Sequence, residues 1–306
     1  MINALKKCSG KATIIILLAI LTVSLAYTFG EDIGIPTWNE LRGGYGTGSD
    51  ELLKVTYLSV GDGDCAYVEG NNFNMVIDTG YPTYESKLAD ILRLKNVKRI
   101  DVLIISHGDE DHIGNTLEVM RSFDVGVIIA PKSDKVDFTK NYTYNEIIDF
   151  AKQKNIEVKY AECGDEFLFN DNNIILRVIA PMEQFSDINN NSLVIKLLYR
   201  DSSYLFTGDI EIKAQKSLLE NGAELAADVV KVPHHGRASS FCEEFMQSVN
   251  ADIAVISCGS TEKFYVSHKL LKFLENNNVC VYRTDTDGNV AVSTTGDGKY
   301  TVSIND

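Results

Sequence analysis

Positive charge is scarce in this chain of 306 residues, and its scarcity excludes one class of protein. The sequence has 29 lysines and arginines against 43 aspartates and glutamates, which gives a formal net charge of −14 at pH 7. A general nucleic-acid coat needs clustered Lys and Arg to neutralise phosphates, so the acidic balance argues against such a protein. Metal cations or a local basic patch could still bring an anionic substrate to the chain.

Cysteine pairs and long apolar runs are also few. The six cysteines include no Cys-x-x-Cys pair and lie among apolar neighbours, so we expect mostly buried thiols rather than disulfides. A long charge-free run occupies residues 12–30, about 19 residues, which is enough to span a bilayer core of roughly 30 Å. Lysines precede this run and acids follow it, which predicts that the rest of the chain lies outside the cytoplasm.

The N-terminal part, residues 1–30, is therefore predicted to be a signal peptide or an N-terminal membrane anchor. Ser24 and Ala26 are small residues at the positions that a signal peptidase reads, so cleavage and retention both stay open. In either case we expect an extracytoplasmic protein, secreted or anchored to the cytoplasmic membrane through residues 12–30. Residues 31–51 are rich in Gly and polar residues without a helical or strand period, which indicates a linker.

Residues 52–306 carry the expected folded domain. Strand-like apolar runs and helix-like amphipathic stretches alternate there, and the order of strands, helix, strand and polar loop occurs twice, at 52–107 and 173–236. This pattern predicts an α/β (α+β) protein in which two sheets pack face to face with helices outside. The expected architecture is a four-layer αββα sandwich.

All five histidines lie in three polar loops of this plan. His107 and His112 follow "DVLII", His234 and His235 follow "DVVKV", and His268 lies in "YVSHKLL". Any one of them could be an ordinary hydrogen-bonded residue, but histidines placed for packing would scatter along the chain. Their grouping therefore favours metal ligands or proton carriers.

The spacing in "ISHGDEDHIGN" suits a metal centre. His107 and Asp109 can hold one ion, and Asp111 and His112 can reach a second. Asp209 ends the apolar run "YLFTGD" and can bridge the two ions. Two such ions would acidify a shared water and stabilise the attacking and leaving oxygens. We therefore expect a hydrolytic centre with one or two divalent cations, zinc or manganese.

Five ordered motifs carry a family resemblance. "HGDEDHIGN", "FTGD" and "VPHHG", preceded by "VGDGDCAYVE" and "NMVIDTG", resemble the metallo-β-lactamase superfamily, and within it the ComEC-type branch of DNA-uptake proteins and exported hydrolases. The resemblance covers about residues 52–300 and includes "VYRTDTDGNVAVST", which is similar to a closing hairpin around an Asp-Gly turn. It implies the metallo-β-lactamase fold, an αββα sandwich with metals at one edge between the sheets.

The resemblance also implies roles for particular residues. The implied metal ligands are His107, Asp109, Asp111, His112, Asp209 and His235. Asp78 would orient a ligand histidine from behind. The expected catalytic residues are Asp111, Asp209 and His234. For His234, a contact to the substrate and a supporting contact to a metal ligand both stay open. Substrate or supporting roles remain open beside ordinary structural ones for Asp64, Asn191, Ser192 and His268.

Two departures from the superfamily pattern bear on the metals. Asp109 stands where most members have His, and a carboxylate there makes manganese more plausible. No histidine lies between His112 and Asp209, so the usual third ligand of the first metal is missing, and Asn191 or Ser192 occupies that place. These departures leave open an arrangement with one filled metal site and one weak metal site.

The substrate implied by the resemblance is a phosphoester, because lactam hydrolysis fits this ligand set poorly. Nucleic acid and a cell-wall phosphodiester are both open, so the chain is interpreted as an exported or anchored nuclease or phosphodiesterase. The alternatives are a cell-surface phosphocholine-esterase-like enzyme and a non-catalytic metal-binding module of the same fold. The sequence implies no protein partner.

Overall fold

The computed structural model describes residues 52–82, 88–131, 141–169, 173–259 and 265–304. Contacts group the chain from Glu51 to Asp306 into one compact unit. The expected signal or anchor and the linker lie outside the described residues. Within the described ranges, no helix combines the length and apolar character needed to cross a membrane.

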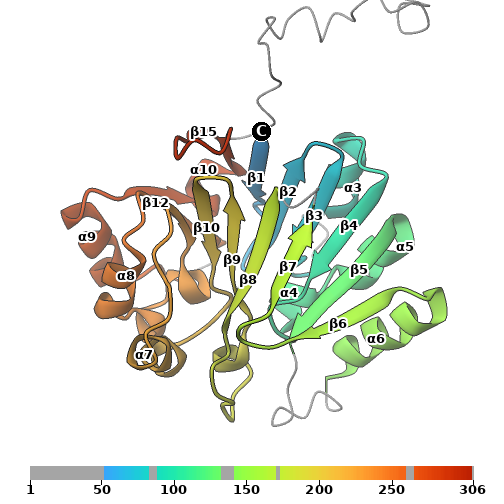
Figure 1. The fold of residues 1–306 in the computed structure, drawn as a ribbon, viewed down its shortest axis with the longest axis horizontal. Coiled ribbons are helices and arrows are strands. Elements are labelled where there is room, and N and C mark those ends of the chain that lie inside the picture. Colours follow the sequence, from blue (N-terminus) through green and yellow to red (C-terminus); the bar gives the residue numbers. More distant parts are fainter. Residues whose placement is uncertain (1–51, 83–87, 132–140, 170–172, 260–264, 305–306) are drawn as a thin grey trace, which may run out of the picture. The chain divides into compact units, whose positions relative to one another are not determined.

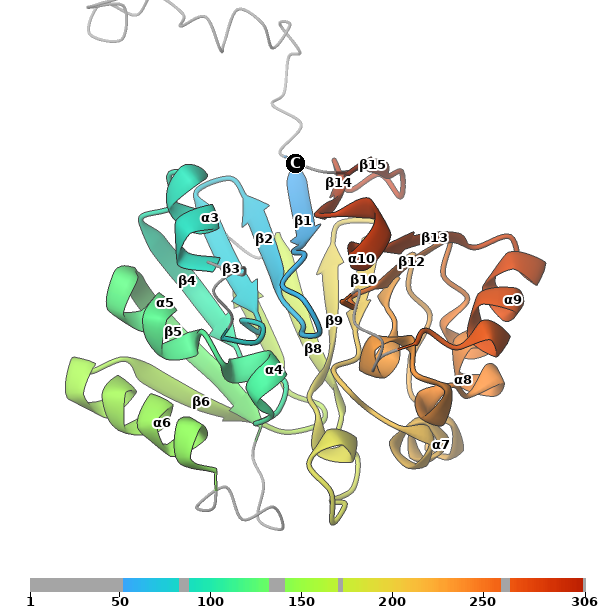
Figure 2. The same ribbon diagram turned by 180° about the vertical axis from the view of Figure 1, so that it is seen from behind.

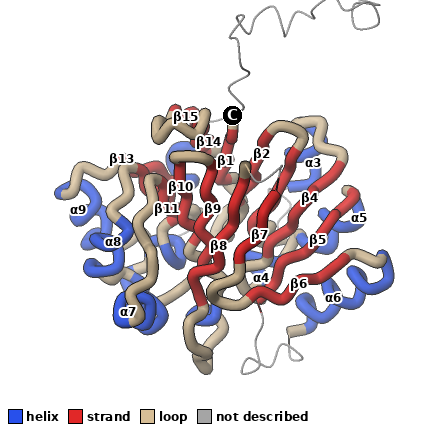
Figure 3. The backbone as a smooth tube through the Cα atoms, viewed as in Figure 1, coloured by secondary structure: helices blue, strands red, loops and turns tan. Residues whose placement is uncertain are grey.

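The strands of this unit form two mixed sheets (Figure 3). The eight-stranded sheet has the order β15-β14-β1-β2-β3-β4-β5-β6. Its strands are β1 (Leu53–Tyr57), β2 (Ala66–Gly70), β3 (Phe73–Ile77), β4 (Arg99–Ile104), β5 (Asp124–Pro131), β6 (Glu157–Ala161), β14 (Val290–Thr294) and β15 (Thr301–Ile304). The seven-stranded sheet has the order β13-β12-β11-β10-β9-β8-β7. Its strands are β7 (Glu166–Phe169), β8 (Ile174–Ala180), β9 (Val194–Tyr199), β10 (Ser202–Phe206), β11 (Val229–Lys231), β12 (Ile253–Ile256) and β13 (Cys280–Arg283).

Helices cover the outer face of each sheet (Figure 1, Figure 2). Those beside the eight-stranded sheet are α3 (Leu88–Leu94), α4 (Glu110–Ile113), α5 (Thr116–Ser122) and α6 (Tyr142–Lys154). Those beside the seven-stranded sheet are α7 (Ile212–Glu220), α8 (Glu243–Val249) and α9 (His268–Asn276), and α10 (Thr284–Asp287) follows β13. Short 3₁₀ segments are η3 (Asn189–Asn191), η4 (Pro233–Gly236) and η5 (Ala238–Ser240).

Three apolar clusters separate the four layers. One lies between the sheets, and each of the others lies between a sheet and its helices. In β4, Val102 and Ile104 belong to the cluster between the sheets, whereas Leu103 and the following Ile105 pack toward the helices. Burial on both faces explains why this strand reads as a continuous apolar run. The predicted αββα sandwich is confirmed.

The described cysteines agree with the expectation of thiols rather than disulfides. All five are free, and Cys65, Cys242 and Cys258 are buried. Cys163 is partly exposed and Cys280 is exposed, so two of them are not core residues.

The predicted closing hairpin around Asp287 and Gly288 is wrong. β13 pairs with β12 in the seven-stranded sheet, whereas β14 pairs with β1 and β15 in the eight-stranded sheet. α10 and Gly288, with φ 72°, carry the chain from one sheet to the other. The Asp-Gly pair did predict a turn. One partner of β14, β1, comes from the other end of the domain, and a local pattern cannot identify it.

Strand directions bring several loops to one edge of the sandwich. β3 and β4 are parallel, as are β10, β11 and β12, so the carboxyl ends of each set share an edge. β2 and β9 run antiparallel to their neighbours and begin at those same edges. There the backbone N–H of Leu193 donates to the carbonyl oxygen of Ser106 at 2.8 Å, which links the two sheets.

Candidate metal centre

Four of the predicted ligands converge at this edge. Asp111, His112, Asp209 and His235 each offer one atom, and these atoms lie within 4.8 Å of one another. His112 Nε2 is 3.3 Å from Asp209 Oδ1, and His235 Nε2 is 3.3 Å from both Asp209 Oδ2 and Asp111 Oδ2. The ligands from α4 thus meet those that follow β10 and β11, so this site draws on both sheets.

Each histidine of this group is held by its other ring nitrogen. His112 Nδ1 donates to Asp78 Oδ2 at 2.8 Å, and His235 Nδ1 donates to the carbonyl oxygen of Ser257 at 3.0 Å. Both Nε2 atoms and Asp209 Oδ1 are buried without a hydrogen-bond partner. Two imidazole lone pairs and two carboxylates turned toward one point are a donor set that suits a divalent cation.

Asp78 takes the supporting place that the sequence predicted. Besides holding His112, its carboxylate accepts hydrogen bonds from the Ser106 N–H at 2.8 Å and from Ser106 Oγ at 2.7 Å. Ser106 Oγ also lies 3.0 Å from His107 Nδ1. One buried carboxylate therefore fixes both histidines of the signature segment.

The other predicted pair, His107 and Asp109, is less complete. His107 is buried and its Nε2 lacks a hydrogen-bond partner, whereas the nearer Asp109 oxygen lies 3.7 Å from it on a side chain that is 41% exposed. Within the described residues, His107 does not join a group of three or more possible ligands. The geometry therefore favours the four-residue group as the stronger site.

The ionisable side chains of the four-residue group shift one another's pKa values. Burial would lower the pKa of both histidines, but nearby carboxylates outweigh burial. Asp209 and Asp78 raise the pKa of His112 well above its usual range. Asp209 and Asp64 do the same for the pKa of His235. Burial would raise the pKa of Asp209, but the two histidines hold it well below its usual range. The carboxylates that raise these pKa values would also favour a divalent cation beside the two imidazoles.

His234 lies beside this group in a strained turn. His234 and His235 have φ of 47° and 55°, a left-handed conformation that non-glycine residues seldom adopt. His234 Nδ1 is 3.0 Å from Ser240 Oγ, and its Nε2 is 3.6 Å from Asp209 Oδ2. Burial lowers the pKa of His234 to about 4, so its imidazole is neutral at pH 7.

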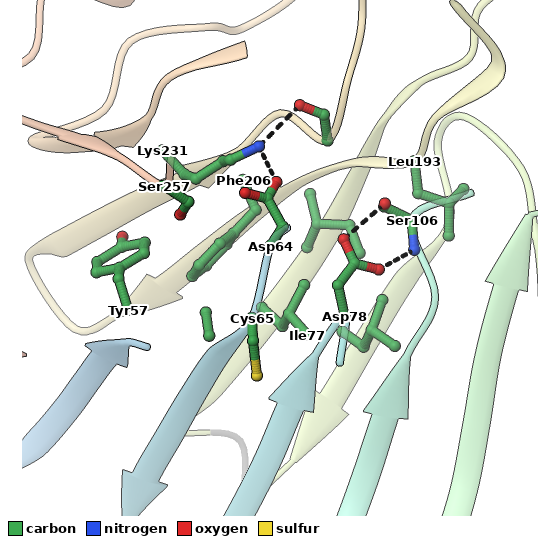
Figure 4. A pocket seen from close by; sticks show the side chains of 14 residues that line it. Tyr57, Asp64, Cys65, Ile77, Asp78, Ser106, Leu193, Phe206, Lys231 and Ser257 are labelled. Atoms are coloured by element: carbon green, nitrogen blue, oxygen red, sulfur yellow. Dashed lines mark hydrogen bonds and ion pairs between the residues drawn. The ribbon is translucent and has the colours of Figure 1, made fainter. Parts of the chain in front are cut away.

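Asp64 is buried beneath the group with a partner that the sequence reasoning missed. Its carboxylate forms an ion pair with Lys231, and the two side chains point toward each other (Figure 4). The Asp64 N–H donates to the carbonyl oxygen of Asp111 at 3.1 Å. Burial would raise the pKa of Asp64, but Lys231 and His235 outweigh burial and lower it. The only sequence signal for Lys231 is a lysine inside the apolar run "DVVKV".

The remaining candidates have other places. Ser192 supports the centre, because its Oγ accepts from the Asp209 N–H at 3.2 Å. Asn191 instead ties its own loop, accepting from the Phe185 N–H at 3.0 Å and donating to the Phe185 carbonyl at 2.8 Å. His268 is exposed at the first turn of α9 and does not belong to the four-residue group.

Comparisons with known proteins identify the family of this chain. Residues 58–260 match the family model of the metallo-beta-lactamase superfamily. The chain is 27% identical over 257 residues to ComE operon protein 3 of Bacillus subtilis, covering 78% of this chain and 32% of that protein. It is 24% identical over 238 residues to Competence protein ComA of Neisseria gonorrhoeae, covering 76% of this chain and 31% of that protein.

These curated relatives are longer, since the chain spans about a third of their length. A solved metallo hydrolase from Ignicoccus hospitalis is 18% identical, with a TM-score of 0.52, and the match covers 78% of this chain and 98% of that one. That likeness concerns the fold. The resemblance inferred from the motifs, including its competence-type branch, is confirmed.

Proposed function

Because the chain belongs to the metallo-β-lactamase superfamily, we propose that it is a metal-dependent hydrolase of phosphoesters. The observation that carries this proposal is the convergence of two carboxylates and two imidazole Nε2 atoms in one group, in which Asp111 is partly exposed and the other three residues are buried. A bound divalent cation would supply Lewis acidity and acidify water there. An acid-rich set of this kind favours zinc or manganese, with the four-residue group as the main site and His107 with Asp109 as a weaker one.

The chain's own residues would hold the cation and position the substrate. Asp209 and His235 would hold the cation, while Asp78 keeps His112 in one orientation. His234 would form a hydrogen bond to the substrate through Nε2, because this neutral imidazole lies next to Asp209. Its hydrogen bond to Ser240 keeps Nδ1 occupied.

The substrate class is proposed from the ligand chemistry and the competence-type relatives. A cation can neutralise a phosphodiester in an otherwise acidic protein, which suits nucleic acid or a cell-wall phosphodiester. We place the enzyme outside the cytoplasm, secreted or anchored through residues 12–30, because this apolar run follows lysines and precedes acids.

Hydrolysis of bis(p-nitrophenyl) phosphate by the purified chain tests the proposal. We expect turnover with added Mn²⁺ or Zn²⁺ and loss of turnover with a chelator. Side-by-side rates on nucleic acid, a phosphocholine ester and a lactam would then separate a nuclease from a phosphocholine-esterase-like enzyme. A folded protein that is inactive with Mn²⁺, Zn²⁺, Co²⁺ and Mg²⁺ would support the non-catalytic metal-binding module instead.

A further inference from the structure

We propose that the buried ion pair between Lys231 and Asp64 is a positioning device for the metal centre, which holds Asp209 and His235 in their places. The inference rests on the proposed metal-dependent function. Neither side chain belongs to the four-residue ligand group. Asp64 lies in a second cluster with Asp78 and His112, which shares His112 with that group.

Apart from its ion pair with Asp64, Lys231 contacts the turn that carries Asp209. Its Nζ donates to the carbonyl oxygen of Gly208 at 3.1 Å and lies 3.6 Å from Asp209 Oδ1. The carbonyl oxygen of Lys231 accepts from Thr207 Oγ1 at 2.7 Å. The ammonium group therefore holds the backbone of this turn and attracts the carboxylate of Asp209, a proposed metal ligand.

The contacts of Asp64 concern the histidines. Its Oδ1 lies 3.4 Å from His235 Nδ1, and its Oδ2 lies 3.9 Å from His112 Nδ1. Its backbone is tied to Asp111 and, through its carbonyl oxygen, to the N–H of Gly80 at 2.8 Å. Asp64 thus reaches three of the segments that supply or support ligands, and Lys231 joins it to a fourth.

Packing alone does not fix these two side chains. Lys231 is 4% exposed and Asp64 is 5% exposed, but a cavity of about 20 Å³ lies against both, bounded also by Tyr57, Phe206 and Ser257 (Figure 4). Beside a cavity, the orientation of these side chains depends on hydrogen bonds and charge rather than on packing contacts on all sides.

General stabilisation is a weak reason for such a pair. Desolvation of two buried charges offsets much of their attraction, so a buried ion pair often adds little to the free energy of unfolding. Lys231 also faces Asp209, which a cation would share. The location of the pair is better explained by the geometry of the ligands than by the stability of the fold.

Three variants test the device: Lys231→Met, Asp64→Asn and the double variant Lys231→Met/Asp64→Asn. Lys196→Met is the matched control, because Lys196 is another buried lysine, on β9, whose Nζ lies 3.4 Å from the carbonyl oxygen of Glu224 and not at the centre. The double variant leaves no unpaired buried charge and keeps the test valid if a single variant fails to fold.

Mn²⁺ affinity and the visible spectrum of the Co²⁺-loaded protein are the readouts, with circular dichroism of the metal-free protein as the check on folding. We expect Lys231→Met and the double variant to bind Mn²⁺ about 10- to 100-fold more weakly, with an altered Co²⁺ spectrum. Lys196→Met should keep wild-type values. A folded double variant with wild-type affinity and spectrum would overturn the proposal.

These measurements need no substrate, so they separate this inference from the proposed hydrolase activity. A wild-type chain that binds metal but hydrolyses nothing would refute the activity, while the affinities would still support or refute the positioning role. A wild-type chain that binds neither Mn²⁺ nor Co²⁺ would refute both proposals.

Discussion

The two nitrogens of each ligand histidine have different tasks. In His112 and His235, Nδ1 is bonded to Asp78 and to the Ser257 carbonyl oxygen, which leaves Nε2 directed at the centre. A ring held in this way loses little rotational freedom when a cation binds. The affinity of the centre should therefore depend on these supporting groups as well as on the ligands.

Asp209 should be the residue whose loss harms activity most. Asp209→Asn keeps the shape of the side chain but removes its charge. The activation free energy should therefore rise by more than about 3 kcal/mol, so that turnover falls roughly a hundredfold. Asp64→Asn should lower turnover only about tenfold, because Asp64 acts through its neighbours. Steady-state rates measure both effects. Equal losses, with unchanged circular dichroism and metal content, would show that the bridging acid is wrongly assigned.

The raised pKa values of His112 and His235 predict a dependence of metal binding on pH. Both imidazoles must lose a proton before they bind a cation, so Mn²⁺ affinity should rise as pH increases from 6.5, the ordinary histidine value. In the metal-free protein, a raised histidine pKa stabilises the fold fully below pH 6.5, and this contribution is lost as pH rises through the folded value.

Unfolding temperatures with and without Mn²⁺ measure this linkage. The difference between the two midpoints should widen as pH increases above 6.5, because the metal-free fold loses stability while the metal binds more tightly. A difference that stays constant with pH would contradict the assignment of both histidines as ligands.

At the scale of elements, the loop before β2 lies very close to the start of α4. A Cβ atom on Gly63 would lie 2.3 Å from the carbonyl oxygen of Asp111 and 2.9 Å from the backbone nitrogen of Tyr81. Both obstacles are backbone atoms, which cannot rotate away as a side chain can. Glycine is therefore required where this loop and the signature segment meet.

Gly63→Ala should push apart the loops that hold Asp64 and Asp111. We expect Mn²⁺ affinity to fall by at least about tenfold, with a lower unfolding temperature. Gly70→Ala is the control, because a Cβ there would meet side-chain atoms at an ordinary 3.6–3.7 Å. Isothermal titration and thermal unfolding compare the two variants. A Gly63→Ala protein that behaves like Gly70→Ala would contradict this account.

Local patterns predicted the elements better than their pairing. The meander of β1, β2 and β3 was predictable, because each strand pairs with the next one along the chain. The place of β14 was not, because Val292 pairs with Val55 across most of the sequence. The alternation of apolar and polar residues predicts which face of a strand is buried. It does not predict which distant strand pairs with it, because that depends on packing of the whole core.

The candidate site was predictable where chemistry shows in residue type. Histidines and aspartates grouped in polar loops pointed to the four-residue group, which the structure brings together. Lys231 was missed because lysines are mostly exposed, and its burial depends on Asp64 from the distant loop before β2. Asn191 was overestimated, because its amide is occupied by Phe185 within its own loop.

For the whole molecule, the arrangement predicts nearer one metal ion per chain than two when supply is limiting. His107 and Asp109 lack a third ligand among the described residues, so they should bind an ion more weakly than the four-residue group. Elemental analysis after dialysis measures the ratio. Two tightly held ions per chain would contradict the prediction.

The same analysis on two histidine variants tests where the ion lies. His235→Ala should lose the retained ion, because it removes one of the four convergent ligands. His268→Ala should keep it, because His268 is exposed on α9. Loss of the ion in the His268 variant would place that residue in the centre after all.

Because the ligands come from both sheets, no short piece of the chain can assemble the centre. Asp111 and His112 are made well before Asp209 and His235, and β1, close to the start of the domain, pairs with β14 near its end. Contacts so distant in sequence form late in folding. A growing polypeptide would therefore remain metal-free until His235 has been synthesised and folded, and the protein would take its ion from the compartment in which folding is completed.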